Sequence, residues 1–541
     1  MTLEYIKRNL LSTKVFIAIV VICSMAVPMH DVFYKHIARD EFFMALNVRA
    51  FQDSPMAPLT FYIGHVATDL FGDNLITLRV LKYLLYFITV GLGCLFFCRV
   101  TGRGKASWYL FALFSLTSCV AAMDVFNWDT VSYPFMVLTL ISTLAYNHHR
   151  TLPKAALTGV CCGLMISSRI PSAVTVPFII LLIFLSHYPV TQKLRDTAGF
   201  LIGAAVTLWL ILWLIYGSTS NLLAAWSTEN IINGHGIDAG SISRMLDDIV
   251  RLSQNMSLTW MLSIACFMFA MVFMRMHRHQ LAGIALITAV LFMLTRALAH
   301  YDETAHICLW QLPAFVFLFM PQISRLFGLG LWNESAKISL TQWILLLFML
   351  IPGVGSDHFY ERIAPMVLMP LILAYCYLPL RRIVITVCGC MAVSVLTLAM
   401  FTTITPHKTP RVNLASISPR TIGIFSTVED ANVYKEHKTV YGQIINRGHT
   451  PTYIGDMRYT YTYLFAPDDI YSLQHFHYIN FANEKKYLKQ LRNFDAVVVN
   501  EPVYADSSDN VAFRSYLHYL GFRDSTQAFT PLPSTTRIYL R

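Results

Sequence analysis

The first residues of this sequence that could do chemistry are two adjacent carboxylates, Asp40 and Glu41. They open a stretch, 41–51, in which apolar residues recur at helical spacing. A carboxylate at a helix start is favoured by the free amide groups and the helix dipole, so an N-terminal cap would account for the pair. The chemical alternative is a general base. A third candidate carboxylate stands directly before another apolar stretch, 130–147, and is Asp129.

Basic residues at the ends of apolar stretches are candidates for binding a phosphate. Arg79 stands near the start of the stretch 75–98, where a structural anchor is the alternative role. Arg169 separates the stretches 155–168 and 171–188. The planar guanidinium fork suits phosphate oxygens better than a lysine ammonium does. We therefore expect Arg169 to contact an anionic part of the substrate.

Two polar clusters lie between later apolar stretches, and both combine histidine with carboxylates. We expect them to contact a phosphate or a sugar. A divalent metal is an alternative, but no ligand spacing such as His-x-x-x-His with an acid is present, so no cofactor is predicted. The candidate residues are His300, Asp302 and Glu303 in the first cluster, and Asp357, His358, Glu361 and Arg362 in the second.

The composition places these residues in a membrane protein. Of the 541 residues, 55% are hydrophobic and 13% are charged, whereas soluble chains carry about 25% charged residues. The apolar stretches predict an α-helical polytopic protein with about 13 transmembrane helices. The net charge of +10 comes from basic residues scattered at the ends of these stretches, which argues against nucleic acid as a partner. The predicted spans are 14–30, 75–98, 107–123, 130–147, 155–168, 171–188, 198–217, 258–274, 280–298, 306–320, 339–353, 363–380 and 383–403.

The loops on the side of the N-terminus hold about twice as many Lys and Arg as the opposite loops, which predicts a cytoplasmic N-terminus. With an odd number of spans, residues 1–404 form the membrane domain and residues 405–541 lie on the outer face. This tail alternates strand-like and helical runs, so we expect a soluble α/β domain. Nearly all acidic loop residues fall on the outer side, and the missing charge relay argues against a transporter. The first outer loop, 30–74, contains two amphipathic stretches that we expect to lie as helices in the membrane interface.

The order of motifs in this loop resembles that of the GT-C membrane glycosyltransferases. Asp40-Glu41 is followed by an amphipathic stretch, an Ala-Pro-Leu at 57–59, an aromatic run and a Leu-Phe-Gly at 70–72. Within the superfamily, the chain is most similar to the aminoarabinose transferase and protein O-mannosyltransferase group. Asp129 matches the second acidic position of these enzymes, and Arg169 matches the basic residue after their fifth span. One departure is Met56, which precedes Ala-Pro-Leu where the family often has a basic residue.

The resemblance implies an enzyme of the bacterial inner membrane that transfers a sugar from a polyprenyl-phosphate donor to a lipid, glycan or protein acceptor. Asp40 would be the base and Glu41 its substitute, while Asp129 would share the same cavity and position the acceptor. Arg169 and Arg79 would contact the donor phosphate. Nucleotide sugars are cytoplasmic, so an outer-face enzyme requires a lipid-linked donor. Its phosphate leaves as a stable anion, so one carboxylate base suffices, and direct displacement inverts the anomeric carbon.

Two other functions stay open at this point. One is a polymerase or ligase that uses pyrophosphate-linked glycans, for which paired arginines would be expected in a large outer loop. The other is a polysaccharide flippase or another transporter, for which internal repeats and polar groups at mid-membrane would be expected. The sequence predicts neither the sugar nor the acceptor.

Overall fold

A computed structural model of the chain describes most of the helices that precede residue 300 and most of the C-terminal region. The described residues are 29–30, 32–34, 39–53, 55–101, 126–225, 239–299, 344, 347–348, 350–354, 410–455, 458–465, 481, 488–501, 503, 507–530 and 535–541. Predicted spans 107–123, 306–320, 363–380 and 383–403 lie outside these residues, and 14–30 and 339–353 are described only at a few positions.

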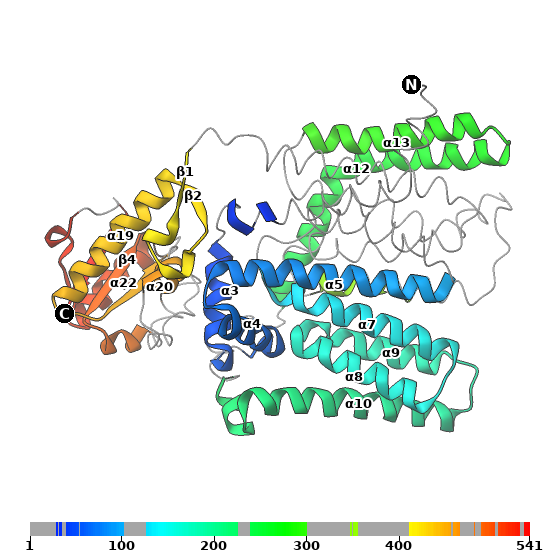
Figure 1. Ribbon diagram of the computed structural model, residues 1–541, viewed down its shortest axis with the longest axis horizontal. Coiled ribbons are helices and arrows are strands. Elements are labelled where there is room, and N and C mark those ends of the chain that lie inside the picture. The colour runs from blue at the N-terminus through cyan, green and yellow to red at the C-terminus, as the bar shows by residue number, and fades with distance from the viewer. Residues whose placement is uncertain are drawn as a thin grey trace.

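Five helices form a layered group in which neighbours run alongside one another (Figure 1). They are α5 (Leu75–Thr101), α7 (Trp128–His148), α8 (Leu152–Ser168), α9 (Thr175–Phe184) and α10 (Val190–Tyr216). Each corresponds to a predicted span, although α10 begins before the apolar stretch 198–217 because the preceding polar residues also favour helix. Within the described residues, two helical segments, 75–96 and 190–216, are long and apolar enough to cross a membrane.

Two further helices, α12 (Ala239–Arg275) and α13 (His279–Ala299), pack against each other beside this group (Figure 1). The predicted span 280–298 matches α13 closely. In contrast, α12 begins well before the predicted span 258–274. Its polar first half, which we expected to be a loop, therefore continues the helix without a break.

Small residues let α8 and α10 approach closely. A Cβ atom on Gly159 of α8 would lie 2.0 Å from the carbonyl oxygen of Phe200 on α10. A Cβ atom on Gly203 of α10 would lie 2.3 Å from the carbonyl oxygen of Ala156 on α8. Both distances are shorter than any real contact, so only glycine fits at these crossings. Close backbone approach at small residues is how helices associate in membranes, where burial of apolar surface gives no driving force.

The described residues of the C-terminal region contain both strands and helices. Four strands form one sheet in the order β3-β4-β6-β5, in which β3 and β4 are parallel and β6 is antiparallel to both β4 and β5. Strands β1 and β2 form a separate antiparallel pair. The elements are β1 (Arg411–Asn413), η5 (Leu414–Ser416), η6 (Pro419–Thr421), β2 (Phe425–Thr427), α19 (Val428–Asn446), β3 (Pro451–Gly455), α20 (Arg458–Phe465), η8 (Lys489–Asn493), β4 (Ala496–Asn500), α22 (Ser507–Tyr519), β5 (Arg523–Asp524), η9 (Thr526–Ala528) and β6 (Thr536–Leu540).

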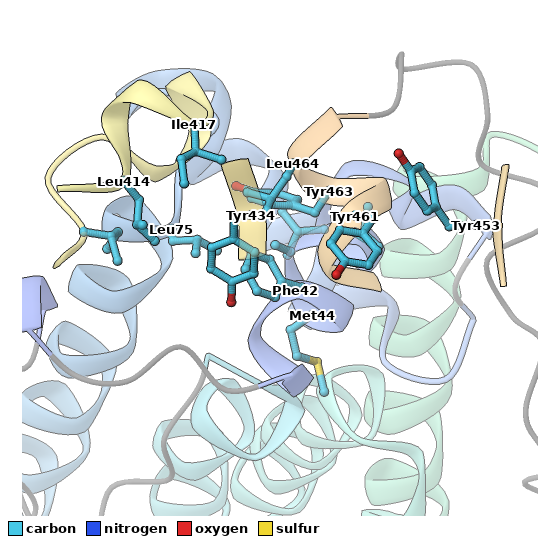
Figure 2. Close-up of a cluster of buried hydrophobic side chains, with 14 of the residues drawn as sticks. Phe42, Met44, Leu75, Leu414, Ile417, Tyr434, Tyr453, Tyr461, Tyr463 and Leu464 are labelled. Atoms are coloured by element: carbon cyan, nitrogen blue, oxygen red, sulfur yellow. The ribbon is translucent and has the colours of Figure 1, made fainter. Parts of the chain in front are cut away.

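The two amphipathic stretches of the first outer loop form α3 (Arg39–Arg49) and α4 (Pro58–Phe71), joined through η1 (Phe51–Asp53). Both lie between the layered helices and the C-terminal region (Figure 1). One hydrophobic cluster runs through this junction, with Phe42 and Met44 of α3, Leu75 of α5, and Tyr434 and Tyr463 of the C-terminal region (Figure 2). The helices are therefore present as predicted, but α3 does not lie in the membrane interface with one face in lipid, because its apolar residues are enclosed by protein.

The end of α4 is different. Leu70 and Phe71 are 71% and 77% exposed, while the buried residues of α4 all lie between Pro58 and Thr68. The apolar stripe predicted for this helix thus divides into a buried start and an exposed end. Only the exposed end retains the character of a helix that meets lipid.

Candidate active site

Asp129 lies in the first turn of α7, at a helix start that the local sequence determines. Asn127 caps this helix: its Oδ1 accepts from the backbone N–H of Thr130 at 3.0 Å, and the Thr130 hydroxyl accepts from the backbone N–H of Asn127 at 3.3 Å. This reciprocal cap fixes where the helix begins. The Asp129 side chain is fully buried, beside amide groups whose dipoles favour its negative charge.

Arg169 lies where α8 ends and the short helix η2 (Ile170–Val174) begins. Proline at position 171 lacks an N–H and cannot continue α8, because its ring would clash with the carbonyl of residue 167. Arg169 accordingly leaves the helical conformation, with φ −157° and ψ 101°. The sequence predicts two spans here, 155–168 and 171–188, and the structure shows two helices separated by this extended residue. Its side chain is only 2% exposed.

The break at Arg169 brings it to Asp129. Its Nε lies 2.6 Å from Asp129 Oδ1, which makes a close ion pair between two buried side chains. The Nη2 group donates to the carbonyl oxygens of Pro352 at 2.8 Å and Val354 at 2.7 Å. The Nη1 group donates to the carbonyl of Ile351 at 3.4 Å. Arg169 therefore joins the start of α7 and the end of α8 to η3 (Ile351–Gly353).

A second buried pair joins α3 to α5. Arg79 Nε lies 2.6 Å from Glu41 Oε1, and Arg79 Nη2 donates to Glu41 Oε2 at 2.8 Å. Its Nη1 donates to the carbonyl of Val32 at 3.0 Å. Both side chains are 3% exposed. This bidentate geometry occupies both carboxylate oxygens, so it favours the anchor role for Arg79 and makes Glu41 the brace of α3 rather than a base with a free oxygen.

Asp40 lies in the first turn of α3, next to that brace. Its side chain lies outside the part of the chain that the structure describes, so its place in the same cavity as Asp129 stays a prediction. The clusters His300, Asp302, Glu303 and Asp357, His358, Glu361, Arg362 also lie outside the described residues. Among the described residues, no group of three or more potential metal ligands is found.

The structure adds one buried cation that the sequence analysis missed. Lys82 is 1% exposed and lies three residues after Arg79 on the same face of α5. Its ammonium group lies 4.3 Å from the centre of the Tyr83 ring. A charged residue inside an apolar span is a signal of function that was visible in the sequence, at the eighth position of the predicted span 75–98.

On the other side of α3, the buried polar groups are neutral. Burial raises the pKa of Tyr463, and the nearby Asp73 adds to this rise. Burial likewise raises the pKa of Tyr434 and Tyr461. These phenols therefore stay protonated near neutral pH and offer no charge to a reaction. The ionic chemistry of the described residues lies on the side of α5, α7 and α8.

Comparison with known proteins finds a family model that matches part of the chain. Residues 53–216 match the dolichyl-phosphate-mannose-protein mannosyltransferase family. They run from η1 to the end of α10 and include Arg79, Asp129 and Arg169. The match confirms the resemblance drawn from the motifs of the first outer loop, and it indicates a glycosyltransferase. No curated protein sequence matches the chain significantly.

Three solved structures are similar at low identity. ArnT from Cupriavidus metallidurans, bound to undecaprenyl phosphate, shares 12% identity over 97% of each chain, with a TM-score of 0.43. An oligosaccharyltransferase from Archaeoglobus fulgidus, in complex with zinc and sulfate, shares 13% identity over 90% of this chain and 67% of its own, with a TM-score of 0.43. AglB from the same organism, with an inhibitory peptide and a dolichol phosphate, shares 13% identity over 92% and 70%, with a TM-score of 0.44.

Proposed function

We propose that this chain is an integral membrane glycosyltransferase that moves a sugar from a polyprenyl-phosphate donor to an acceptor at the outer face of the bacterial inner membrane. The single observation that carries the proposal is the family match over residues 53–216. Within this segment lies the buried pair of Asp129 and Arg169, and directly before it lies α3 with Asp40. In this orientation the N-terminus is cytoplasmic and the C-terminal region is extracytoplasmic.

The proposed reaction is a single displacement. The acceptor hydroxyl or amine attacks the anomeric carbon, and its proton passes to the carboxylate of Asp40. The bond between the anomeric carbon and the phosphate oxygen breaks, and its electron pair leaves with the polyprenyl phosphate. No acid is required for a leaving group that is already a stable anion, and attack from the opposite face inverts the anomeric centre.

Asp40 is a better candidate for the base than Glu41. Glu41 gives both oxygens to Arg79, so a proton transfer to it would have to break a buried, charge-assisted pair. The same pair fixes the helix that carries Asp40. Glu41 thus supports the base by holding α3 in place, and its role as substitute base is the less favoured one.

Arg169 and its partners are proposed to form the phosphate end of the site. A cation there stabilises the charge that builds on the departing phosphate. Because Arg169 holds the carbonyls of 351–354, it also fixes the point from which the chain continues to Asp357 and Arg362. We propose that these residues and the His300 to Glu303 cluster complete the contacts to the donor, while Asp129 positions the acceptor.

The test is a donor-consumption assay on the purified full chain in lipid vesicles. A panel of polyprenyl-phosphate sugars is supplied with a membrane lipid extract as the source of acceptors, and release of free polyprenyl phosphate is measured. We expect one member to be consumed, with its sugar transferred in the inverted configuration. The matched control is Asp40→Asn, which keeps the volume of the side chain and removes the base.

Consumption of a pyrophosphate-linked glycan, with no polyprenyl-phosphate sugar used, would contradict the proposed donor and favour the polymerase or ligase alternative. Movement of an intact lipid-linked glycan across the bilayer without release of its carrier would favour the flippase. Measuring both products in the same vesicles separates the three functions.

A further inference from the structure

Asp73 joins three segments that are distant in the sequence. Its Oδ2 lies 3.3 Å from Nε of Arg49, at the end of α3, and 3.5 Å from Nε of Arg420, in η6 of the C-terminal region. Asp73 itself stands between α4 and α5. It directly follows Gly72, whose φ of 101° lies in the left-handed region that favours glycine. The turn at the end of α4 therefore places this carboxylate between two arginines.

Arg420 also contacts Tyr463 in two ways. Its Nη1 donates to the carbonyl oxygen of Tyr463, and its guanidinium lies 5.6 Å from the centre of the Tyr463 ring. The Tyr463 side chain is fully buried. Its ring lies 5.6 Å from the ring of Phe42, which is the residue after Glu41 on α3 (Figure 2). A continuous path of contacts thus leads from Asp73 through Arg420 and Tyr463 to the start of α3.

This path reaches α3 at both ends. Arg49, in its last turn, contacts Asp73, and Phe42, near its first turn, contacts Tyr463. The opposite side of α3 is held by the pair of Glu41 and Arg79. Since a helix fixed at both ends and on both sides has little freedom to tilt, the C-terminal region contributes to where the first turn of α3 lies.

We propose that Arg420 is a positioning residue of the transferase, which sets α3, and with it Asp40, through Asp73 and Tyr463. This inference rests on the proposed function. It makes the C-terminal region a part of the catalytic unit rather than a separate module, because a contact within it determines the geometry of the proposed base.

Adhesion between the two regions is the competing explanation. The Arg420 and Asp73 side chains are 18% and 39% exposed, and ion pairs with this exposure contribute little to folding. Adhesion alone therefore predicts almost no change in activity when the contact is removed. Positioning predicts a loss of turnover, because a small displacement of a catalytic group has a large effect on rate.

The experiment compares Arg420→Ala and Asp73→Asn, which remove the contact from its two sides, with Arg447→Ala as the matched control. Arg447 likewise stacks on an aromatic ring, that of Phe529, and donates to a carbonyl, that of Ala528, but within the C-terminal region only. The measurements are kcat and the KM for the polyprenyl-phosphate donor found in the consumption assay, together with hydrogen exchange of the α3 amides.

We expect kcat to fall about 10- to 100-fold in both Arg420→Ala and Asp73→Asn, on the scale set by small misplacements of reacting groups. The donor KM should change by about twofold or less, because the phosphate end of the site is untouched, and α3 should exchange faster. Arg420→Lys should recover part of kcat, since a lysine keeps the charge beside Asp73. Arg447→Ala should match the wild type.

Wild-type kcat in both Arg420→Ala and Asp73→Asn would overturn the positioning role, and so would an equal loss in Arg447→Ala. Failure of the proposed function gives a different result, since the wild-type chain would then consume no polyprenyl-phosphate sugar. If Arg420→Ala does not fold, Asp73→Asn decides the question, because it changes a partly exposed residue between two helices.

Discussion

The helical part of the chain and the C-terminal region bury polar groups in opposite ways. All the buried Asp, Glu, Lys and Arg side chains that the structure describes belong to the helical part, and they are Glu41, Arg79, Lys82, Asp129, Arg169 and Asp196. In the described residues of the C-terminal region, the buried polar groups are hydroxyls and His437. Both regions have dense hydrophobic packing, so the difference lies in charge and not in burial.

The difference separates a part that can do ionic chemistry from a part that supports it. A buried ion is costly unless it is paired and hydrogen-bonded, so fixed pairs such as Glu41 with Arg79 are retained only where geometry is well determined. Neutral aromatic groups have no such requirement, and they give the C-terminal region a surface against which α3 can pack. The boundary between the two kinds of burial runs along α3, the helix that carries Asp40.

The largest effect is expected from removing the proposed base. Asp40→Asn should lower kcat by about 10²- to 10⁴-fold, the range of general base catalysis, with normal folding and membrane insertion. Donor consumption at matched protein level measures it. Asp430→Asn is the control on the C-terminal side. The Asp430 side chain, in the first turn of α19, accepts a hydrogen bond from the Ser426 hydroxyl. Near-normal turnover in Asp40→Asn would show that Asp40 is not the base. It would also contradict the proposal that the helical part does the ionic chemistry while the C-terminal region supports it.

The next largest effect is expected from breaking the buried ion pair of Glu41 and Arg79, and this effect is a loss of stability. Arg79→Met leaves Glu41 buried without its guanidinium, which we expect to cost about 3–5 kcal/mol of stability. Thermal unfolding in detergent, followed by light scattering, measures the loss. The double variant Glu41→Leu with Arg79→Met removes both charges and should regain most of it. Equal destabilisation in the double variant would show that packing, not the unpaired charge, explains the result.

The phosphate end of the site provides the third test. Arg169→Lys keeps the charge but loses the fork that reaches both Asp129 and the carbonyls of Pro352 and Val354. We expect donor binding to weaken about tenfold, and further in Arg169→Ala, because a charge-assisted hydrogen bond from the guanidinium to the donor phosphate would contribute about 1.5–3 kcal/mol. Direct binding of the polyprenyl-phosphate donor measures this. Unchanged affinity in Arg169→Ala would make Arg169 an anchor of the 351–354 segment only.

The local features of this site could be predicted from the sequence, and the pairings could not. The start of α7 follows from its capping residues and the end of α8 from Pro171, so Asp129 and Arg169 were placed correctly at helix ends. That Arg169 would meet Asp129 depends on how α7 and α8 pack. The pair of Glu41 with Arg79 likewise depends on how α3 crosses α5, which no spacing within the sequence contains.

The contact between the C-terminal region and α3 could not be predicted from the sequence either. Phe42 and Tyr463 each occupy an ordinary apolar position in their own helix. Nothing in the local sequence indicates that two residues so far apart in the chain are in contact. For the same reason, the amphipathic pattern of 41–51 suggested a lipid-facing helix. A pattern of apolar residues predicts that a face is covered, and it does not say whether lipid or protein covers it.

The smallest expected effect tests whether the buried polar groups of the C-terminal region are neutral. His437 of α19 is 2% exposed and stacks on Tyr461 at 3.9 Å. Burial lowers the pKa of His437 to about 4, from an ordinary value of about 6.5. Above pH 6.5 the imidazole is neutral in both the folded and the unfolded chain, so it has no effect on stability there. As the pH falls from 6.5 to 4, the unfolded chain takes up the proton first, and the C-terminal region should lose about 3 kcal/mol of stability.

His437→Phe keeps an aromatic ring in this position and cannot be protonated. We expect it to change stability little at pH 7 and to make the C-terminal region more resistant to acid than the wild type, by about 2 kcal/mol at pH 4.5. Limited proteolysis of the full chain across this pH range, with cleavage in residues 410–541 as the signal, measures the difference. His518→Gln, at an exposed position of α22, serves as the control. Identical acid sensitivity in His437→Phe and the wild type would show that burial does not lower the pKa of His437. The contrast between a charged and a neutral interior would then rest on the tyrosines alone.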